Sequence, residues 1–217
     1  MTRAILFDSD GVLVDSEQLF FEATRAAFQR AGGSLSREQW ARWYLGQGKS
    51  SREIAGLVGI SASRVDEMIA RRDRWFWNRI DQGVAIRPGV IEALNILAED
   101  FRLAVVTGAS REHYERVHAL SGLRDFFEVT VTSDECEHVK PHPEGYQRAL
   151  QRLSLKPCEC LAVEDSPRGA IAALAAGIPC VVIPTHLTDL PLCPSECALL
   201  DNVSRLAQFL ERETSAS

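Results

Sequence analysis

Residues 4–16 read AILFDSDGVLVDS, and this stretch decides the fold. Its first four residues are apolar and have the length of a buried strand, and Asp8 and Asp10 follow them directly. A carboxylate at the end of a core strand is costly unless a partner neutralises its charge. Because side chains alternate along an extended chain, Asp8 and Asp10 share one face while Ser9 turns away from it. The two acids are therefore predicted to face the same ligand.

Further apolar runs of strand length follow later in the chain, at 103–106, 129–132, 161–163 and 180–183. Helical patterns precede or separate these runs, at 89–98, 111–121, 143–153 and 167–176. In the last of these patterns Ser166 suits a helix cap, Pro167 the first turn and Gly177 the stop. Strands that alternate with helices form right-handed crossovers and a parallel sheet covered on both faces. We therefore expect an α/β fold built on a parallel sheet.

The segment between the first and second expected strands contains no convincing strand and reads as helical. Ser36 with Gln39 and Ser63 with Asp66 have the spacing of capping boxes at the start of two helices. All four tryptophans lie in this segment, and aromatic residues at helical spacing favour internal packing over a ligand platform. The segment is predicted to be an inserted helical subdomain.

We place the inserted helical cap domain at residues 16–86. The core is then formed by residues 1–15 and 87–217. The cap has 11 Lys/Arg against 8 Asp/Glu, and the remainder has 13 against 22, which gives net charges of +3 and −9. Such a difference usually reflects ordinary surface variation. The alternative, that the cap faces an anionic ligand, stays open.

Composition restricts the class of protein. The chain has 217 residues, of which 46% are hydrophobic and 25% charged, as in ordinary globular proteins. Its net charge of −6 and the lack of a basic tract argue against nucleic acid as a partner. No apolar run approaches the roughly 20 residues that span a bilayer. We expect a cytoplasmic protein with no membrane partner, and nothing in the sequence requires more than a monomer.

Cysteines and histidines give no clear metal pattern. Cys158-x-Cys160 and Cys193-x3-Cys197 could be half-sites for a metal, but no second matching pair or histidine cluster accompanies them. Reduced, partly buried thiols are the favoured interpretation. The five histidines lack metal-type spacing, and we interpret them as surface or packing residues.

Polar residues follow the expected strands, at the edge of a parallel sheet where ligands bind. They are Asp8 and Asp10, then Thr107, Gly108, Ala109 and Ser110, then Lys140, and finally Glu164, Asp165 and Ser166. Clustered carboxylates need a cation, and oxygen-only ligands favour a hard ion, above all Mg²⁺. Lys140 and Thr107 would complete a clamp for phosphate, and one carboxylate could attack phosphorus to form an aspartyl-phosphate.

Four segments, in chain order, resemble the four motifs of the haloacid dehalogenase superfamily: DSDGVLVDS, VVTGAS, VKPHPEGY and VEDSPRGAIAALAAGIP. With the helical insert they cover nearly the whole chain. The resemblance is to the branch that holds phosphoglycolate phosphatases, small sugar-phosphate phosphatases and β-phosphoglucomutase. It implies a Rossmann-like core with a helical cap and a Mg²⁺-dependent phosphatase of a small phosphorylated metabolite. Intramolecular phosphoryl transfer of the mutase kind is the alternative, and a non-catalytic binding module is a third interpretation.

The resemblance also implies roles for the acidic residues. Asp8 corresponds to the nucleophile and to a metal ligand. Asp10 corresponds to the general acid and base, and its backbone carbonyl binds the metal. Asp165 corresponds to the remaining metal ligand, and Glu164 orients a metal-bound water. Because dehalogenases and phosphonate-cleaving relatives lack an acid two positions after the nucleophile, Asp10 indicates phosphate-ester chemistry.

The remaining implied roles concern the substrate. Thr107, the Gly108 amide and Lys140 correspond to groups that hold the phosphoryl oxygens, and Ala109 lies in the same substrate-binding loop. Lys49, in LGQGKSSRE, aligns with a cap loop that meets substrate in relatives, and Arg52 is its substitute.

The segment Asp15-Ser16-Glu17 lies where the family places the hinge into the cap. A turn and helix start, with an acid in the first helical turn, explains this segment equally well.

Overall fold

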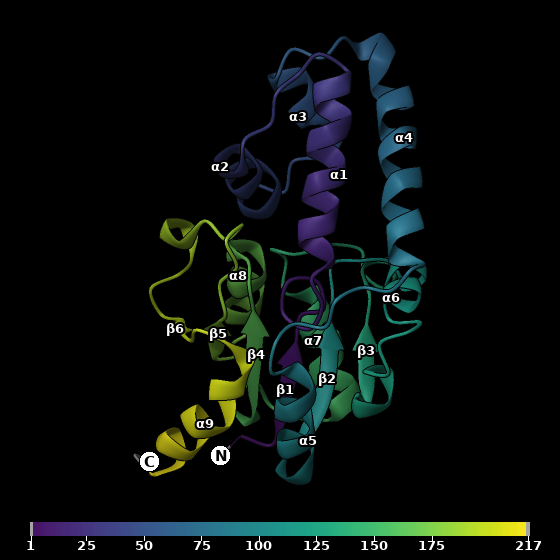
Figure 1. Ribbon diagram of the computed structural model, residues 1–217. Coiled ribbons are helices and arrows are strands. Elements are labelled where there is room, and N and C mark those ends of the chain that lie inside the picture. Colours follow the sequence, from purple (N-terminus) through teal and green to yellow (C-terminus); the bar gives the residue numbers. More distant parts are fainter. Residues whose placement is uncertain (1, 216–217) are drawn as a thin grey trace.

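The computed structural model describes residues 2–215, with side chains as far as residue 212. Within this range the strands form one six-stranded parallel sheet in the order β3-β2-β1-β4-β5-β6 (Figure 1). The strands are β1 (Ala4–Phe7), β2 (Arg102–Val106), β3 (Val129–Val131), β4 (Cys160–Glu164), β5 (Cys180–Val182) and β6 (Ala198–Leu199). The predicted α/β fold with a parallel sheet is confirmed. The edge strand β6 was not predicted, because two residues are too few to give an apolar pattern.

Helices cover both faces of the sheet. On one face α5 (Val90–Asp100), α6 (Arg111–Val117) and α9 (Leu206–Ser215) contribute to an apolar cluster that includes Ile5 and Phe7 of β1. On the other face α7 (Glu144–Leu153) and α8 (Pro167–Ala175) pack with Ala4 and Leu6. The first strand is thus buried on both faces, which fixes the position of the residues that follow it.

Two of the predicted helix ends can be compared with the structure. Helix α8 begins at Pro167 after Ser166, whose hydroxyl accepts a hydrogen bond from Gly169 N, as predicted. Helix α6 ends at Val117 and not at 121. Ser121 Oγ donates to His118 O and accepts from Leu123 N, so side-chain hydrogen bonds replace the last helical turn.

The helical cap lies between β1 and β2 in sequence and over the carboxyl ends of the strands in space (Figure 1). It consists of α1 (Ser16–Arg30), α2 (Arg37–Trp40), the π-helical turn η1 (Ala41–Gly46), α3 (Ser51–Leu57) and α4 (Ala62–Ile80). These elements enclose their own apolar cluster around Phe28 and Trp40, both fully buried. Trp75 is 43% exposed, and Trp77 packs against the sheet-side apolar cluster beside His113 and Arg116 of α6, so the prediction that every tryptophan packs inside the cap is wrong for these two residues.

The capping boxes in the cap domain agree only in part with those predicted from the sequence. Ser36 and Gln39 form the predicted box at α2. The box predicted at Ser63 is wrong, because α4 begins at Ala62 and Ser63 lies inside the helix. A box that was not predicted, Ser50 with Glu53, starts α3.

The chain leaves and re-enters the core through two segments that lie side by side. Val14 and Ile86 form an antiparallel bridge, Asp15 N donates to Ala85 O at 2.9 Å, and Arg87 N donates to Leu13 O at 3.0 Å. Paired backbones at this point give the cap a defined attachment over the sheet edge. In the described part of the chain, no helix combines the length and the apolar character needed to cross a membrane. All six cysteines are free thiols.

Candidate active site

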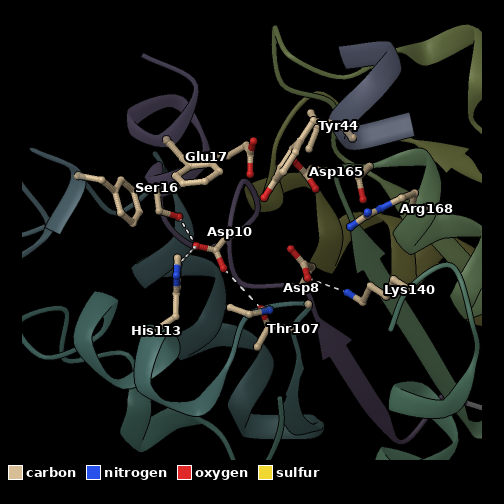
Figure 2. Close-up of a pocket in the computed structure, with 16 residues that line it drawn as sticks. Asp8, Asp10, Ser16, Glu17, Tyr44, Thr107, His113, Lys140, Asp165 and Arg168 are labelled. Carbon is tan, nitrogen blue, oxygen red and sulfur yellow. Dashed lines mark hydrogen bonds and ion pairs between the residues drawn. The ribbon is translucent and has the colours of Figure 1, made fainter. Parts of the chain in front are cut away.

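A cavity of about 260 Å³ lies between the carboxyl ends of the strands and the cap. It is lined by most of the residues predicted from the sequence: Asp8, Asp10, Thr107, Gly108, Ala109, Lys140 and Asp165. Ser9 points elsewhere, since its Oγ lies 2.9 Å from His118 Nε2, as the strand alternation predicts. Figure 2 shows the acidic and basic side chains converging on this cavity.

Lys140 is the cation at the base of the cavity. Its Nζ donates to Asp8 Oδ1 at 2.6 Å, to Glu164 Oε1 at 2.5 Å and to Val106 O at 2.7 Å. All three of its donor positions are therefore occupied. Burial would lower the pKa of Lys140, but the negative charges of Asp8 and Glu164 hold it above its ordinary value.

Asp8 is buried among more negative than positive charge. Burial raises the pKa of Asp8 to about 7, and the nearby Glu164 and Asp10 act in the same direction against Lys140. Glu164 itself is completely buried and also accepts a hydrogen bond from Tyr146 Oη at 2.6 Å. The raised pKa of Asp8 thus reflects more buried negative charge than Lys140 neutralises.

Asp165 supplies the observation that indicates a metal. Its Oδ2 is buried and has no hydrogen-bond partner among the described residues. Burial first, and then the charges of Asp8 and Glu164, raise the pKa of Asp165 well above its ordinary value. Ligand oxygens of these three acids lie within 4.8 Å of one another, so the donor set fits a hard divalent ion. A Cβ on Gly11, where φ is 94°, would come 2.1 Å from Asp165 Oδ2, so glycine is needed for this close approach.

Asp10 is held as a carboxylate. Ser16 Oγ donates to its Oδ1, which also lies 3.4 Å from His113 Nε2, and Thr107 Oγ1 lies 3.5 Å from its Oδ2. Burial alone would raise the pKa of Asp10, but His113 and the Ser16 hydrogen bond lower it to about 2. Burial likewise opposes the charged form of His113, yet Asp10 raises the pKa of His113 above its ordinary value. The prediction that every histidine is a surface or packing residue is therefore wrong for His113.

The loop after β2 exposes polar groups toward the cavity. Thr107 Oγ1 accepts a hydrogen bond from Ala109 N at 3.0 Å, which shapes the turn. A Cβ on Gly108 would meet nothing within 4 Å, so its backbone is open to a ligand. These positions agree with the predicted role of the loop in holding phosphoryl oxygens, which stays a prediction.

The cap contributes residues that sequence reasoning missed. Glu17 of α1 lines the cavity, accepts a hydrogen bond from Trp40 Nε1 at 2.9 Å, and has its pKa raised to about 7 by burial. Its place in the first turn of a helix gave no signal of this. Lys49 is not among the lining residues, and its contact with substrate stays a prediction. The other cap residues at the cavity are Ser16, Phe20, Tyr44, Leu45 and Phe76.

The chain is similar to one family model and to several known proteins. The model of the haloacid dehalogenase-like hydrolase family matches residues 5–183. YhcW of Bacillus subtilis is 35% identical over an alignment 197 positions long, which covers 87% of this chain and 86% of YhcW. Hexitol phosphatase B of Escherichia coli is 30% identical over an alignment 198 positions long, which covers 83% of each chain. The crystal structure of CbbY from Rhodobacter sphaeroides in complex with xylulose-(1,5)bisphosphate is 28% identical, with a TM-score of 0.76 over 95% of this chain and 96% of CbbY.

Proposed function

The chain belongs to the haloacid dehalogenase-like hydrolases, and from this premise we propose a Mg²⁺-dependent phosphatase that forms an aspartyl-phosphate on Asp8. Relatives such as hexitol phosphatase B support a small phosphorylated substrate, of the sugar-phosphate or phosphoglycolate type. The observation that carries the proposal is the arrangement around Lys140. Its single ammonium contacts both Asp8 and Glu164, while Asp165 Oδ2 has no hydrogen-bond partner among the residues that the structure describes. This excess of buried negative charge fits a divalent cation.

The residues that would hold Mg²⁺ are Asp8, Asp165 and the backbone carbonyl of Asp10, with Glu164 orienting a ligand water. When bound, Mg²⁺ would neutralise these acids and polarise the phosphoryl group of the substrate. We place the metal-binding acids in a core of residues 1–15 and 87–217 and the substrate-enclosing surface in a cap of residues 16–86. The proposed enzyme is cytoplasmic and monomeric.

The chemical steps use the side chains at the ends of the strands. Asp8 Oδ attacks phosphorus, so an Asp–phosphoryl bond forms as the bond to the ester oxygen breaks, and Asp10 gives that oxygen a proton. Asp10 then removes a proton from the water that hydrolyses the aspartyl-phosphate. Lys140 and Thr107 hold the non-bridging oxygens in both steps.

The low pKa of Asp10 suits the second of these steps, in which a carboxylate must accept a proton. The first step needs the acid form. A phosphate dianion placed beside Asp10 disfavours its charged form and raises its pKa, so substrate binding itself favours protonation.

Phosphate release from p-nitrophenyl phosphate and a panel of phosphorylated sugars and short acids tests the proposal. We expect release that requires Mg²⁺ and disappears in Asp8→Asn. Asp201→Asn, at an exposed position of the core, is the matched control and should keep full activity. Unchanged activity in Asp8→Asn would contradict the mechanism. β-Glucose 1-phosphate distinguishes the mutase alternative, which yields glucose 6-phosphate in place of free phosphate.

A further inference from the structure

We propose that Arg168 forms a subsite for a second anionic group of the substrate. The inference rests on the proposed phosphatase function and narrows its substrate class. The substrate is then a small phosphate ester that carries a carboxylate or a second phosphate away from the reacting phosphoryl group. Arg168 would bind this distal group, while Lys140 and Thr107 hold the reacting one.

The position of the guanidinium supports this role. Arg168 belongs to α8 and lines the cavity. Figure 2 shows its guanidinium pointing into the cavity from the side of Asp165, while Asp10 and His113 lie on the other side. A Cβ on Gly48 would come 2.6 Å from Arg168 Nη1, so this core side chain extends as far as the cap loop. A ligand enclosed between core and cap therefore passes close to Arg168.

The hydrogen bonding of Arg168 is incomplete. Its Nε is buried and has no partner in the described part of the chain. A guanidinium carries a fixed fork of donors that matches a carboxylate or a phosphate. A buried donor without an acceptor is costly, and an anionic oxygen of a ligand would remove that cost.

Helix stability does not explain an arginine at this position. Arg168 is the second residue of α8, near the positive end of the helix dipole, where a cation is unfavourable. Ser166 already provides the cap of this helix. The same dipole strengthens the attraction for an anion bound beside Arg168.

The charges around the cavity leave Arg168 available. Lys140 donates to Asp8 and Glu164 at the base of the cavity, where we place the reacting phosphoryl group, so its position does not serve a distal group. Within residues 2–212, Arg168 forms no ion pair closer than 4 Å. The negative charge of Glu17 acts on the same space, and its raised pKa reduces this competition near neutral pH. A cavity of about 260 Å³ also restricts the ligand to a small metabolite.

The test compares matched substrates that differ in the distal group. One pair is 2-phosphoglycolate and 2-hydroxyethyl phosphate, and the other is 1,4-butanediol bisphosphate and 4-hydroxybutyl phosphate. We expect wild type to favour the doubly anionic member of at least one pair by about tenfold or more in kcat/KM. The pair that shows the preference identifies the distal group as a carboxylate or a phosphate.

In Arg168→Gln this preference should fall to near unity through a higher KM, while turnover of the singly charged esters stays within about threefold of wild type. Arg168→Lys, which keeps the charge, should retain part of the preference. Arg205→Gln, at an exposed position of the core, should leave it unchanged. Thermal unfolding of each variant checks that the fold is intact.

Two results would overturn the subsite: equal kcat/KM values within both pairs in wild type, or a preference that persists in Arg168→Gln. Phosphate release continues in either case, so the proposed function stands. Absence of release from every ester would remove the proposed function. Calorimetric titration of Asp8→Asn with the same pairs then decides the subsite. An affinity difference that disappears with Arg168→Gln supports it, and equal affinities overturn it.

Discussion

At the scale of single residues, Asp8 and Asp10 lie two positions apart and yet have opposite pKa shifts. Burial among other acids raises the pKa of Asp8 to about 7, whereas His113 and Ser16 lower that of Asp10 to about 2 despite burial. Because both acids follow the same strand, their local sequence does not explain the difference. It arises from side chains that the fold brings next to each of them, such as Glu164 beside Asp8 and His113 beside Asp10. These opposite shifts fit the roles proposed for the two residues, nucleophile for Asp8 and acid-base group for Asp10.

The pairing of His113 with Asp10 predicts a pH-dependent contribution to stability. Because the pKa of Asp10 is lowered in the folded protein, its carboxylate stabilises the fold at pH values above its ordinary pKa of 3.8. This stabilisation is lost as pH falls through about 2. Because the pKa of His113 is raised, its imidazolium stabilises the fold at pH values below its ordinary pKa of 6.5. This stabilisation is lost as pH rises through the pKa of His113 in the folded protein. Urea unfolding of metal-free His113→Gln at pH 5 should therefore show a loss of about 1 kcal/mol that shrinks at pH 9.

The same variant should lose activity by about tenfold or more, because Asp10 is no longer oriented. His142→Gln, in an exposed loop outside the cavity, is the matched control. A stability loss of equal size at both pH values would show that packing, and not the ion pair, is the contribution of His113.

At the scale of elements, α8 approaches β4 so closely that only glycine fits between them. A Cβ on Gly169 would come 1.8 Å from Glu164 Oε2, and Glu164 is fixed by Lys140 and Tyr146. We expect Gly169→Ala to lower the free energy of unfolding by about 2 kcal/mol or more and to abolish activity. Gly56→Ala, exposed in α3 with nothing within 4 Å, should instead stabilise the protein by about 0.5–1 kcal/mol. Equal effects of the two substitutions in thermal unfolding would contradict this reading of the contact.

Glu135 connects the turn after β3 to two helices. It pairs with Arg111 of α6 at 2.6 Å and Arg152 of α7 at 2.5 Å. Burial alone would raise the pKa of Glu135, but Arg152 and hydrogen bonds from Thr132 lower it to about 2. The ionised Glu135 therefore stabilises the fold at pH values above its ordinary pKa of 4.5, and this stabilisation is lost as pH falls through about 2.

Because a quarter of the Glu135 side chain is exposed, solvent screens the pair, and we expect Glu135→Gln to cost about 1 kcal/mol at pH 7. Urea unfolding at pH 7 and pH 2.5 should show this difference decreasing at the lower pH. Glu128→Gln removes a more exposed pair with Arg102 and should have a smaller effect. A pH-independent loss in Glu135→Gln would exclude the ion pair as its cause.

At the scale of the whole molecule, the sequence predicted the core better than the cap. Strands buried on both faces have continuous apolar runs, and the residues after them meet at one sheet edge, so Asp8, Lys140 and Asp165 could be placed together in advance. Glu17 and Arg168 were missed as site residues for a physical reason. Each lies in the first turn of a helix, and only the docking of cap on core decides that it faces the cavity.

The proposed metal site would couple ion binding to the stability of the whole core. Burial and the charges of Asp8 and Glu164 raise the pKa of Asp165, so its ionised form destabilises the metal-free fold. The contribution of this carboxyl to stability is therefore full below pH 3.8 and decreases as pH rises through the folded pKa. Metal-free Asp165→Asn should therefore unfold at a higher temperature than wild type at pH 8.

Mg²⁺ should reverse this order. An ion that binds only the folded state stabilises it by about 2.7 kcal/mol at a hundred times its Kd, which corresponds to a rise of several degrees in Tm for wild type. Asp165→Asn lacks one ligand charge and should show little shift, while the exposed control Asp201→Asn should respond as wild type does. Calorimetric scans of the three proteins with EDTA and with saturating Mg²⁺ measure the six Tm values. A full Mg²⁺-induced rise in the Tm of Asp165→Asn would place the metal elsewhere. If instead Asp165→Asn has the higher Tm without Mg²⁺ and wild type has the higher Tm with it, the residue that costs stability without the ion must be the one that binds it.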